Sequence, residues 1–334
     1  MPTETEWPEA PKGIQFRSIR GEADAEAIRA VHVGRQAHDG VDELSTLEGV
    51  PSLEYVREAL RGAVAEEQHL VGRWLVAQAG EQVAGYSRLS SWPEADGTRV
   101  YLSLGWVLPA WRGRGIGSAM LQWAEASSRR MAAAEHPGEK AELAANASRT
   151  EKEATALLLQ AGYRVAYTTL EMGLEAAEPV PPHPLPAGLE IRPVQPEHYL
   201  PISASVLSAY RGEFPGGRYS EVEDVEIYAA SLRAPEEDPA LWHVAWAGEQ
   251  VAGQVLARIA RGRAEVFEVS VLPPWRRRGL ARALLTRAVG QLQAQGIGVI
   301  RLHTVAEFPT QAVNLYRKVG FRALKEFPRY RKPM

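Results

Sequence analysis

Two stretches of the chain decide its fold, Val107-Leu108-Pro109-Ala110-Trp111-Arg112-Gly113-Arg114-Gly115-Ile116-Gly117 and Val271-Leu272-Pro273-Pro274-Trp275-Arg276-Arg277-Arg278-Gly279-Leu280-Ala281. Each follows a β-branched, aromatic run that predicts a strand, and each precedes an amphipathic run that predicts a helix, at 118–133 and 281–294. Small residues let the backbone approach a phosphate closely. The first turn of a helix offers unpaired N–H groups, and arginine offers forked donors. The pattern therefore predicts an anion-binding turn in each half.

A second repeated pair indicates that the chain is a duplicated domain. Ala79-Gly80-Glu81-Gln82-Val83-Ala84-Gly85 recurs as Ala247-Gly248-Glu249-Gln250-Val251-Ala252-Gly253. A repeat with so long a period is not a solenoid. The proline-rich stretch 178–188 should be extended and act as a spacer. We predict a flexible N-terminus at 1–13, a first domain at 14–175, a linker at 176–188 and a second domain at 189–334.

Each half alternates strand and helix patterns in the same order. An opening strand and polar helical segments precede a hairpin around the Gly-Glu turn, followed by the strand, turn and helix described above. This order predicts an α/β (α+β) domain in which helices flank a mixed, mostly antiparallel twisted sheet.

Composition excludes several classes of function. The 334 residues are 45% hydrophobic and 24% charged, which is typical of a soluble globular protein. The net charge of -3 does not recruit nucleic acid or an anionic membrane. The lack of cysteine excludes a thiolate metal site and a cysteine nucleophile. No stretch is apolar enough for a signal or a membrane span, so the expected location is cytoplasmic.

The turn is neither a Walker A loop nor a dinucleotide fingerprint. One isolated R-x-x-G-x-G/A match would fit a helix start with solvated arginines equally well, but two copies in one context favour a phosphate site. In this context the sequence resembles the GNAT superfamily of N-acetyltransferases, whose acetyl-CoA pyrophosphate loop has this pattern. Ala312-Val313-Asn314-Leu315-Tyr316-Arg317-Lys318-Val319-Gly320-Phe321 resembles the family's A-x-x-L-Y-x-x-x-G-F ending. The resemblance covers about 14–175 and 189–332.

The resemblance implies a splayed pair of strands that binds acetyl-CoA, with an exposed strand edge for the pantetheine arm. An amine then attacks the thioester directly through a tetrahedral intermediate, and no metal is needed. The cofactor-binding residues that it implies are Val107, Arg112, Gly113, Arg114, Gly115, Ile116, Gly117 and Ser118, and Val269, Val271, Arg276, Arg277, Arg278, Gly279, Leu280, Ala281, Arg282 and Asn314. Asn314 would serve equally as a solvated helix residue.

An amine acceptor needs a general base. Deprotonating a lysine-like amine at pH 7 costs about 4.6 kcal/mol. The resemblance implies a carboxylate on the fourth strand, for which Glu265 and Glu268 are the candidates. Strand alternation puts them on opposite faces unless a bulge intervenes, and both would also serve as solvent-facing charges. By sequence offset, Tyr101 stands for Glu265 in the first half, whose strand has no acid.

The same resemblance makes Tyr316 the general acid for the leaving thiolate, although a core aromatic would also suit the position. In the first half Leu158 replaces it. We therefore predict that the second domain is catalytic. For the first domain, structural binding of acetyl-CoA, an empty pocket and slow turnover all remain open.

The acceptor stays open at this stage, as a small-molecule or peptide amine chosen by variable loops such as 210–219. The tandem arrangement with a degenerate first half also resembles mycothiol-synthase-type enzymes, and antibiotic-modifying acetyltransferases are a further possibility. A non-catalytic acetyl-CoA sensor is the alternative from another class. We expect a monomer or homodimer that binds neither nucleic acid nor membrane.

Overall fold

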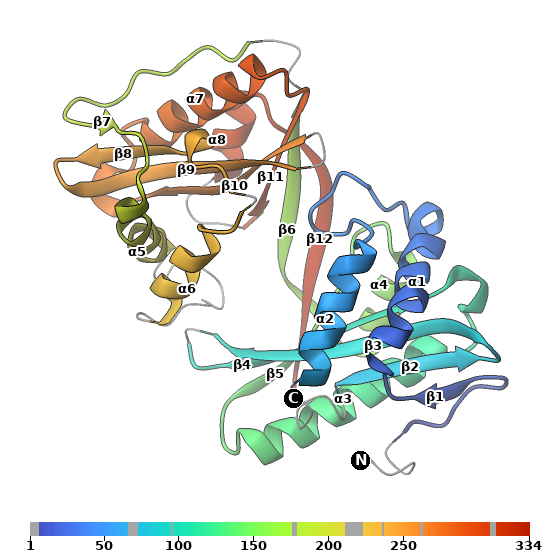
Figure 1. Ribbon diagram of the computed structural model, residues 1–334. Helices are drawn as coiled ribbons and strands as arrows, with labels where there is room; N and C mark the ends of the chain where they lie inside the picture. The colour runs from blue at the N-terminus through green and yellow to red at the C-terminus, as the bar shows by residue number, and fades with distance from the viewer. Residues whose placement is uncertain are drawn as a thin grey trace. The chain divides into compact units, whose positions relative to one another are not determined.

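The computed structural model describes residues 7–65, 73–94, 96–175, 179–210, 223–235, 237–260, 263–307 and 312–334. The chain divides into two compact units, unit 1 (Met1–Pro93, Gly97–Ala166 and Phe327–Met334) and unit 2 (Glu94–Asp96 and Tyr167–Glu326). Each contains a mixed sheet with helices on both faces (Figure 1). This confirms the predicted fold class. No helix in the described part of the chain is long and apolar enough to cross a membrane.

The elements of unit 1 follow the predicted order. They are β1 (Gln15–Arg17), α1 (Ala25–Asp39), α2 (Leu53–Ala65), β2 (Trp74–Ala79), β3 (Gln82–Pro93), β4 (Arg99–Val107), α3 (Ile116–Glu135), β5 (Ala141–Asn146) and α4 (Lys152–Gln160). The strands lie side by side from β1 to β5, with β4 and β5 parallel and the other neighbours antiparallel.

Unit 2 repeats this plan. Its elements are β7 (Glu190–Ile191), α5 (Tyr199–Tyr210), α6 (Glu223–Ser231), β8 (His243–Ala247), β9 (Gln250–Ala260), β10 (Arg263–Val271), α7 (Leu280–Ala294), β11 (Val299–Val305) and α8 (Ala312–Val319). The strands lie in the order β7-β8-β9-β10-β11, and β10 and β11 are parallel.

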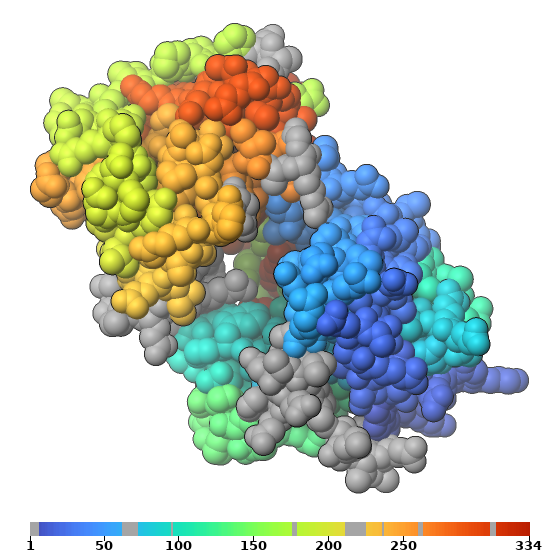
Figure 2. Space-filling model, in the orientation of Figure 1, coloured from blue at the N-terminus to red at the C-terminus, as the bar shows by residue number. Residues whose placement is uncertain are grey.

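Strand alternation explains why each sheet is covered on both faces. In β2, Leu75 and Ala77 pack against α3, whereas Val76 between them packs against α1 and α2. In unit 2, α7 covers one face of the sheet and α5 the other (Figure 1). Helices α5 and α6 pack side by side, as do α1 and α2 (Figure 2). Each fully buried large aliphatic side chain stabilises such a layer by about 1.5–3 kcal/mol.

The closing strands β6 (Arg164–Glu175) and β12 (Arg322–Pro333) join the opposite units. β6 follows α4 in the chain but pairs antiparallel with β11, from Val299↔Glu175 to Val305↔Thr169. The end of β12 pairs antiparallel with β5. The compact units therefore differ from the predicted domains at 14–175 and 189–334. The repeat does not reveal this exchange, because β5 and β11 both offer an edge that any antiparallel strand can satisfy.

The predicted terminus and linker are partly described. Trp7 packs against the α3 core of unit 1. Linker residues 179–186 form neither helix nor strand and contact α7, where Gln293 accepts a hydrogen bond from the Val180 backbone at 3.4 Å. Residues 1–6 and 176–178 and most of the predicted acceptor loop, 211–219, lie outside the described residues.

We expect strand β12 to contribute to the stability of unit 1, with which it packs. Tyr330 is 2% exposed and packs with Tyr101, Leu143 and Tyr163 of that unit. Tyr330→Ala should lower the free energy of unfolding by about 3–5 kcal/mol, whereas Tyr55→Ala, at a residue 61% exposed, should change it by less than about 0.5 kcal/mol. Urea denaturation followed by circular dichroism measures both. Equal changes in the free energy of unfolding for the two variants would contradict the packing of β12 with unit 1.

Candidate active site

In unit 2, strands β10 and β11 separate before they end. Among the described residues their parallel ladder ends at Glu265↔Arg301. Beyond that pair, the register between β10 and β9 shifts between Val266 and Glu268, so Phe267 is the extra residue of a β-bulge. A cavity of about 700 Å³ opens beside the separated strand ends. The sheet is therefore splayed where the resemblance implied a cofactor site.

Most cofactor-binding residues predicted for the second half line this cavity. They are Val269, Val271, Arg276, Arg277, Gly279, Leu280, Ala281, Arg282 and Asn314, and the predicted general acid Tyr316 lines it too. Arg278 is not among them, because its guanidinium lies over the Trp275 ring, 5.0 Å from the centroid. Nine further lining residues are not among the predicted site residues, namely His183, Ala209, Tyr210, Ser270, Trp275, Thr304, Ala312, Leu315 and Lys318.

The turn before α7 has a backbone suited to an anion. Gly279 has a φ of 84° and directly precedes the first residue of the helix. Arg277 has a φ of 61°, the only positive φ of a non-glycine residue in the described chain, and unit 1 has Gly113 at the same position. Arg276 clamps the turn, since it donates from Nε to the Val271 carbonyl at 2.9 Å and from Nη2 to that of Ala209 at 2.7 Å. Two donors of Arg276 are thus bonded to backbone carbonyls.

The charge of the cavity suits a polyanion such as coenzyme A. Four basic residues line the cavity, Arg276, Arg277, Arg282 and Lys318. No aspartate or glutamate is among the lining residues that the structure describes. His183 adds an imidazole from the linker, and its Nε2 lies only 2.8 Å from where a Cβ on Gly279 would be. A cationic cavity attracts and orients phosphate groups.

The bulge brings Glu265 and Glu268 to one face of β10. They lie opposite Arg258 and Leu256, two residues that alternate to the same side of β9. His303 of β11 lies beside them, with Nδ1 3.7 Å from Glu265 Oε1. The sequence analysis made a shared face conditional on a bulge, and the structure contains that bulge.

The two acids differ strongly in basicity. Burial raises the pKa of Glu265, but hydrogen bonds and charge from His303 and Arg258 outweigh burial and lower it to about 2. Arg258 binds its Oε2 through Nη2 at 2.8 Å and Nε at 3.0 Å. Burial raises the pKa of Glu268 to about 7, although hydrogen bonds from Tyr210 and other neighbours partly oppose the rise. Glu268 is thus the better proton acceptor near neutral pH.

Tyr316 of α8 completes the group of ionisable side chains. It is 6% exposed, and burial together with the charge of Glu268 raises the pKa of its phenol. The hydroxyl therefore stays protonated at neutral pH and able to donate. Tyr316 also packs within the apolar core of unit 2. Its environment is therefore compatible with both interpretations drawn from the sequence, a general acid and a core aromatic.

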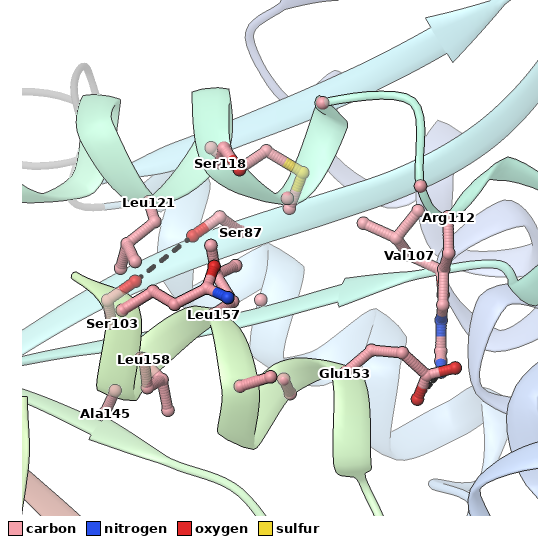
Figure 3. Close-up of a pocket in the computed structure, with 18 of the residues that line it drawn as sticks. Ser87, Ser103, Val107, Arg112, Ser118, Leu121, Ala145, Glu153, Leu157 and Leu158 are labelled. Atoms are coloured by element: carbon pink, nitrogen blue, oxygen red, sulfur yellow. Dashed lines mark hydrogen bonds and ion pairs between the residues drawn. The ribbon is translucent and has the colours of Figure 1, made fainter.

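Unit 1 has a smaller cavity, of about 490 Å³, at the corresponding place (Figure 3). Of the predicted residues it is lined by Val107, Arg112, Gly113, Gly115, Gly117 and Ser118. Arg114 lies over the Trp111 ring instead, and Ile116 is buried in the core. Figure 3 shows Leu158 of α4 in this cavity, at the position that Tyr316 has in the repeat.

Acidic residues neutralise the turn of unit 1. Arg112 forms a fork with the Asp39 carboxylate at 2.6 and 2.8 Å, and Asp39 is 1% exposed. Glu153 lines the cavity 3.5 Å from Arg112 (Figure 3). Asp39, Glu153 and His38 also bring possible metal ligands together, but Arg112 already supplies the positive charge there. This turn is a poorer site for a diphosphate than its glycine pattern suggests.

The β-ladders correct one predicted equivalence. β4 pairs with β3 in continuous register, without a bulge. Leu102 opposes Ser90 as Glu265 opposes Arg258, so Leu102, and not Tyr101, is the structural counterpart of Glu265. The sequence offset failed because only one of the two strands contains an extra residue.

In unit 1, the sheet face that corresponds to the one with Glu265 and Glu268 in unit 2 is covered by aromatic rings. Tyr86 hydrogen-bonds His32 at 2.7 Å and packs against Trp74 and Trp106. Burial lowers the pKa of His32 to about 3, so this histidine is neutral. No acid of β4 faces this cluster, since Leu104 is the counterpart of Glu268.

Comparisons with known proteins agree with this geometry. The profile of the acetyltransferase (GNAT) family matches residues 41–149 and 204–321. A mycothiol acetyltransferase of Streptomyces avermitilis is 28% identical over 95% of this chain and 94% of its own length, and one of Clavibacter michiganensis is 31% identical over 68% and 70%.

Two solved structures are similar over nearly the whole chain. A GCN5-related N-acetyltransferase from Sphaerobacter thermophilus has a TM-score of 0.73 and 25% identity, and covers 97% of this chain and 96% of its own. A tandem GNAT protein from the clavulanic acid biosynthesis pathway has a TM-score of 0.65 and 15% identity, and covers 96% and 98%. The predicted fold of two tandem GNAT-like domains is confirmed.

The buried carboxyl of Glu268 should destabilise the protein at high pH. Its pKa rises from 4.5 to about 7 on folding, so the folded chain binds a proton more tightly and stability falls as pH rises through this window. Glu268→Gln should therefore gain about 3 kcal/mol of unfolding free energy over the parent at pH 8 and almost nothing at pH 4. Denaturant unfolding at the two pH values measures the gain, with Glu249→Gln, whose side chain is 94% exposed, as the control. An equal gain at both pH values would contradict the raised pKa.

Proposed function

The chain belongs to the acetyltransferase (GNAT) family, and we propose that unit 2 is its catalytic unit, with Glu268 as general base and Tyr316 as general acid. The enzyme is thus an N-acetyltransferase that uses acetyl-CoA. One observation carries the proposal: the bulged, splayed strand of unit 2 brings a buried acid, a protonated phenol and a cationic cavity to one place.

Different parts of unit 2 bind different parts of acetyl-CoA. Acetyl-CoA supplies the thioester that the amine attacks. The turn at 276–281, with Arg282 and Lys318, binds the phosphates, and the edge of β10 at Val269 and Val271, beyond its ladder with β11, pairs with the pantetheine arm.

Proton transfer favours Glu268 over Glu265 as the base. A group with a pKa near 7 accepts the amine proton at neutral pH and passes it on readily. Glu265, with a pKa of about 2 and held by Arg258, is a far weaker base and orients its neighbours instead. Tyr316 donates to the departing thiolate, because its raised pKa keeps it protonated.

The acceptor is a small-molecule amine. The curated relatives carry the name mycothiol acetyltransferase and match the chain over most of its length, which supports the amine of a sugar-linked cysteine as the first acceptor to test. The loop 211–222, beside the cavity residue Tyr210, lies outside the described residues.

Unit 1 binds acetyl-CoA more weakly than unit 2, or not at all. Its cavity is smaller, and the charges of Arg112 and Glu153 that line it cancel. Leu102, Leu104 and Leu158 stand where unit 2 has its two acids and its phenol.

Calorimetry with acetyl-CoA tests where the cofactor binds. Ser118 and Arg282 occupy the same position in the first turn of α3 and α7, and both line their cavities. Arg282→Glu should weaken the tightest site about tenfold or more, and the matched Ser118→Glu should leave it unchanged. The reverse pattern would assign the tight site to unit 1.

Steady-state kinetics tests the assigned roles. Glu268→Gln and Tyr316→Phe should each lower kcat/KM about 100-fold or more in release of coenzyme A, and the parent profile should lose activity below about pH 7, where Glu268 becomes protonated. Glu265→Gln should leave the acid limb near pH 7. An acid limb abolished by Glu265→Gln instead would identify Glu265 as the base.

A further inference from the structure

Tyr210 touches both the candidate base and the strand that would carry the cofactor. It is the last residue of α5, and its hydroxyl lies 2.9 Å from Glu268 Oε1 and 3.1 Å from the Val269 carbonyl. One hydroxyl proton serves either acceptor at a given time. The phenol also lines the cavity, so it stands between the buried acid and the space where the thioester would lie.

The backbone that carries Tyr210 is fixed on the sheet. Arg276 donates to the carbonyl of the preceding residue, Ala209, and to Val271 of β10. One turn earlier in α5, Ser205 donates to Gln254 at 2.8 Å, and Gln254 donates to Ser270 at 2.6 Å. The carbonyl that Arg276 binds and the hydroxyl that contacts Glu268 therefore belong to adjacent residues, Ala209 and Tyr210, at the end of α5.

We infer that Tyr210 is a positioning residue for acetyl transfer in unit 2: its hydroxyl holds the Glu268 carboxylate at the edge of β10, beside Val269. The inference rests on the proposed function. Glu268 lies directly after the bulge and beyond the last pair of the ladder with β11, so a donor from another element fixes its carboxylate. A donor that is itself clamped to the cofactor turn ties the position of the base to that turn.

Other groups also face Glu268. Besides Tyr210 of α5, they are Tyr228 of α6, Ser270 of β10, His303 of β11 and Tyr316 of α8. A hydrogen bond donated to a carboxylate favours its charged form. Loss of the Tyr210 donor should therefore make Glu268 easier to protonate, even with the other donors in place.

The test is Tyr210→Phe in the full chain, compared with Tyr199→Phe. Tyr199 lies at the other end of α5 and packs on Trp242 and Arg233. Tyr210→Phe should lower kcat about tenfold, leave KM for acetyl-CoA within about twofold, and move the acid limb of kcat/KM up by about one pH unit. Tyr199→Phe should move neither kcat nor the limb.

A purely structural role predicts lower activity at every pH with an unmoved limb, and that result would overturn the inference. Fluorotyrosine at position 210 gives the opposite sign, since its more acidic phenol is a stronger donor and should move the limb to lower pH. This second variant keeps the bulk of the ring, so it decides the matter if the phenylalanine variant folds poorly. If Glu268→Gln itself keeps full activity, the base assignment fails; if only the Tyr210 variants leave the limb unmoved, the positioning role alone fails.

Discussion

The β-bulge at Phe267 is the feature on which the candidate site depends. An extra residue in β10 breaks its register with β9 between Val266 and Glu268, and the parallel ladder with β11 ends at Glu265. Beyond that point β11 no longer pairs with β10, and side chains of Tyr210 and Arg276 donate to the Val269 and Val271 carbonyls instead. The bulge also turns the side chain of Glu268 to the face that Glu265 occupies. Cofactor edge, cavity and paired acids thus have one geometric origin.

The surroundings of the two acids on this strand give their carboxyl groups different pKa values. Both carboxyls are buried, yet Glu265 has a guanidinium and an imidazole beside it, and Glu268 has mainly neutral hydroxyl donors. Opposite charge within contact distance favours ionisation, whereas burial without a countercharge favours the proton. Pairs of groups whose pKa values are pushed apart in this way are typical of acid–base sites.

Duplication shows how one scaffold supports two different pockets. Both units keep the left-handed glycine before the helix, Gly115 and Gly279, and an arginine that clamps the preceding strand. Unit 1 lacks the bulge, extends its parallel ladder to Ser103↔Ala145 and fills one face with aromatic rings. Its clamp arginine binds a buried carboxylate, where that of unit 2 binds a backbone carbonyl. The two units share a fold but differ in the side chains that line their cavities.

The amino-acid sequence by itself determined the duplication, the strand–turn–helix junctions and the family. These depend on residues close together in the chain, such as the glycines of the turns and the spacing of Tyr316 from Phe321. It also located the residues of the two turns that line the cavities.

Only the tertiary structure decided which sheet the closing strands join and which acid has the raised pKa. The same holds for the counterpart of Glu265 in unit 1 and for the contact of Tyr210 with Glu268. Pairing edges, burial and electrostatic neighbours come from residues far apart in the sequence, and one inserted residue on a strand reverses every side chain beyond it. No local pattern in the chain contains that information.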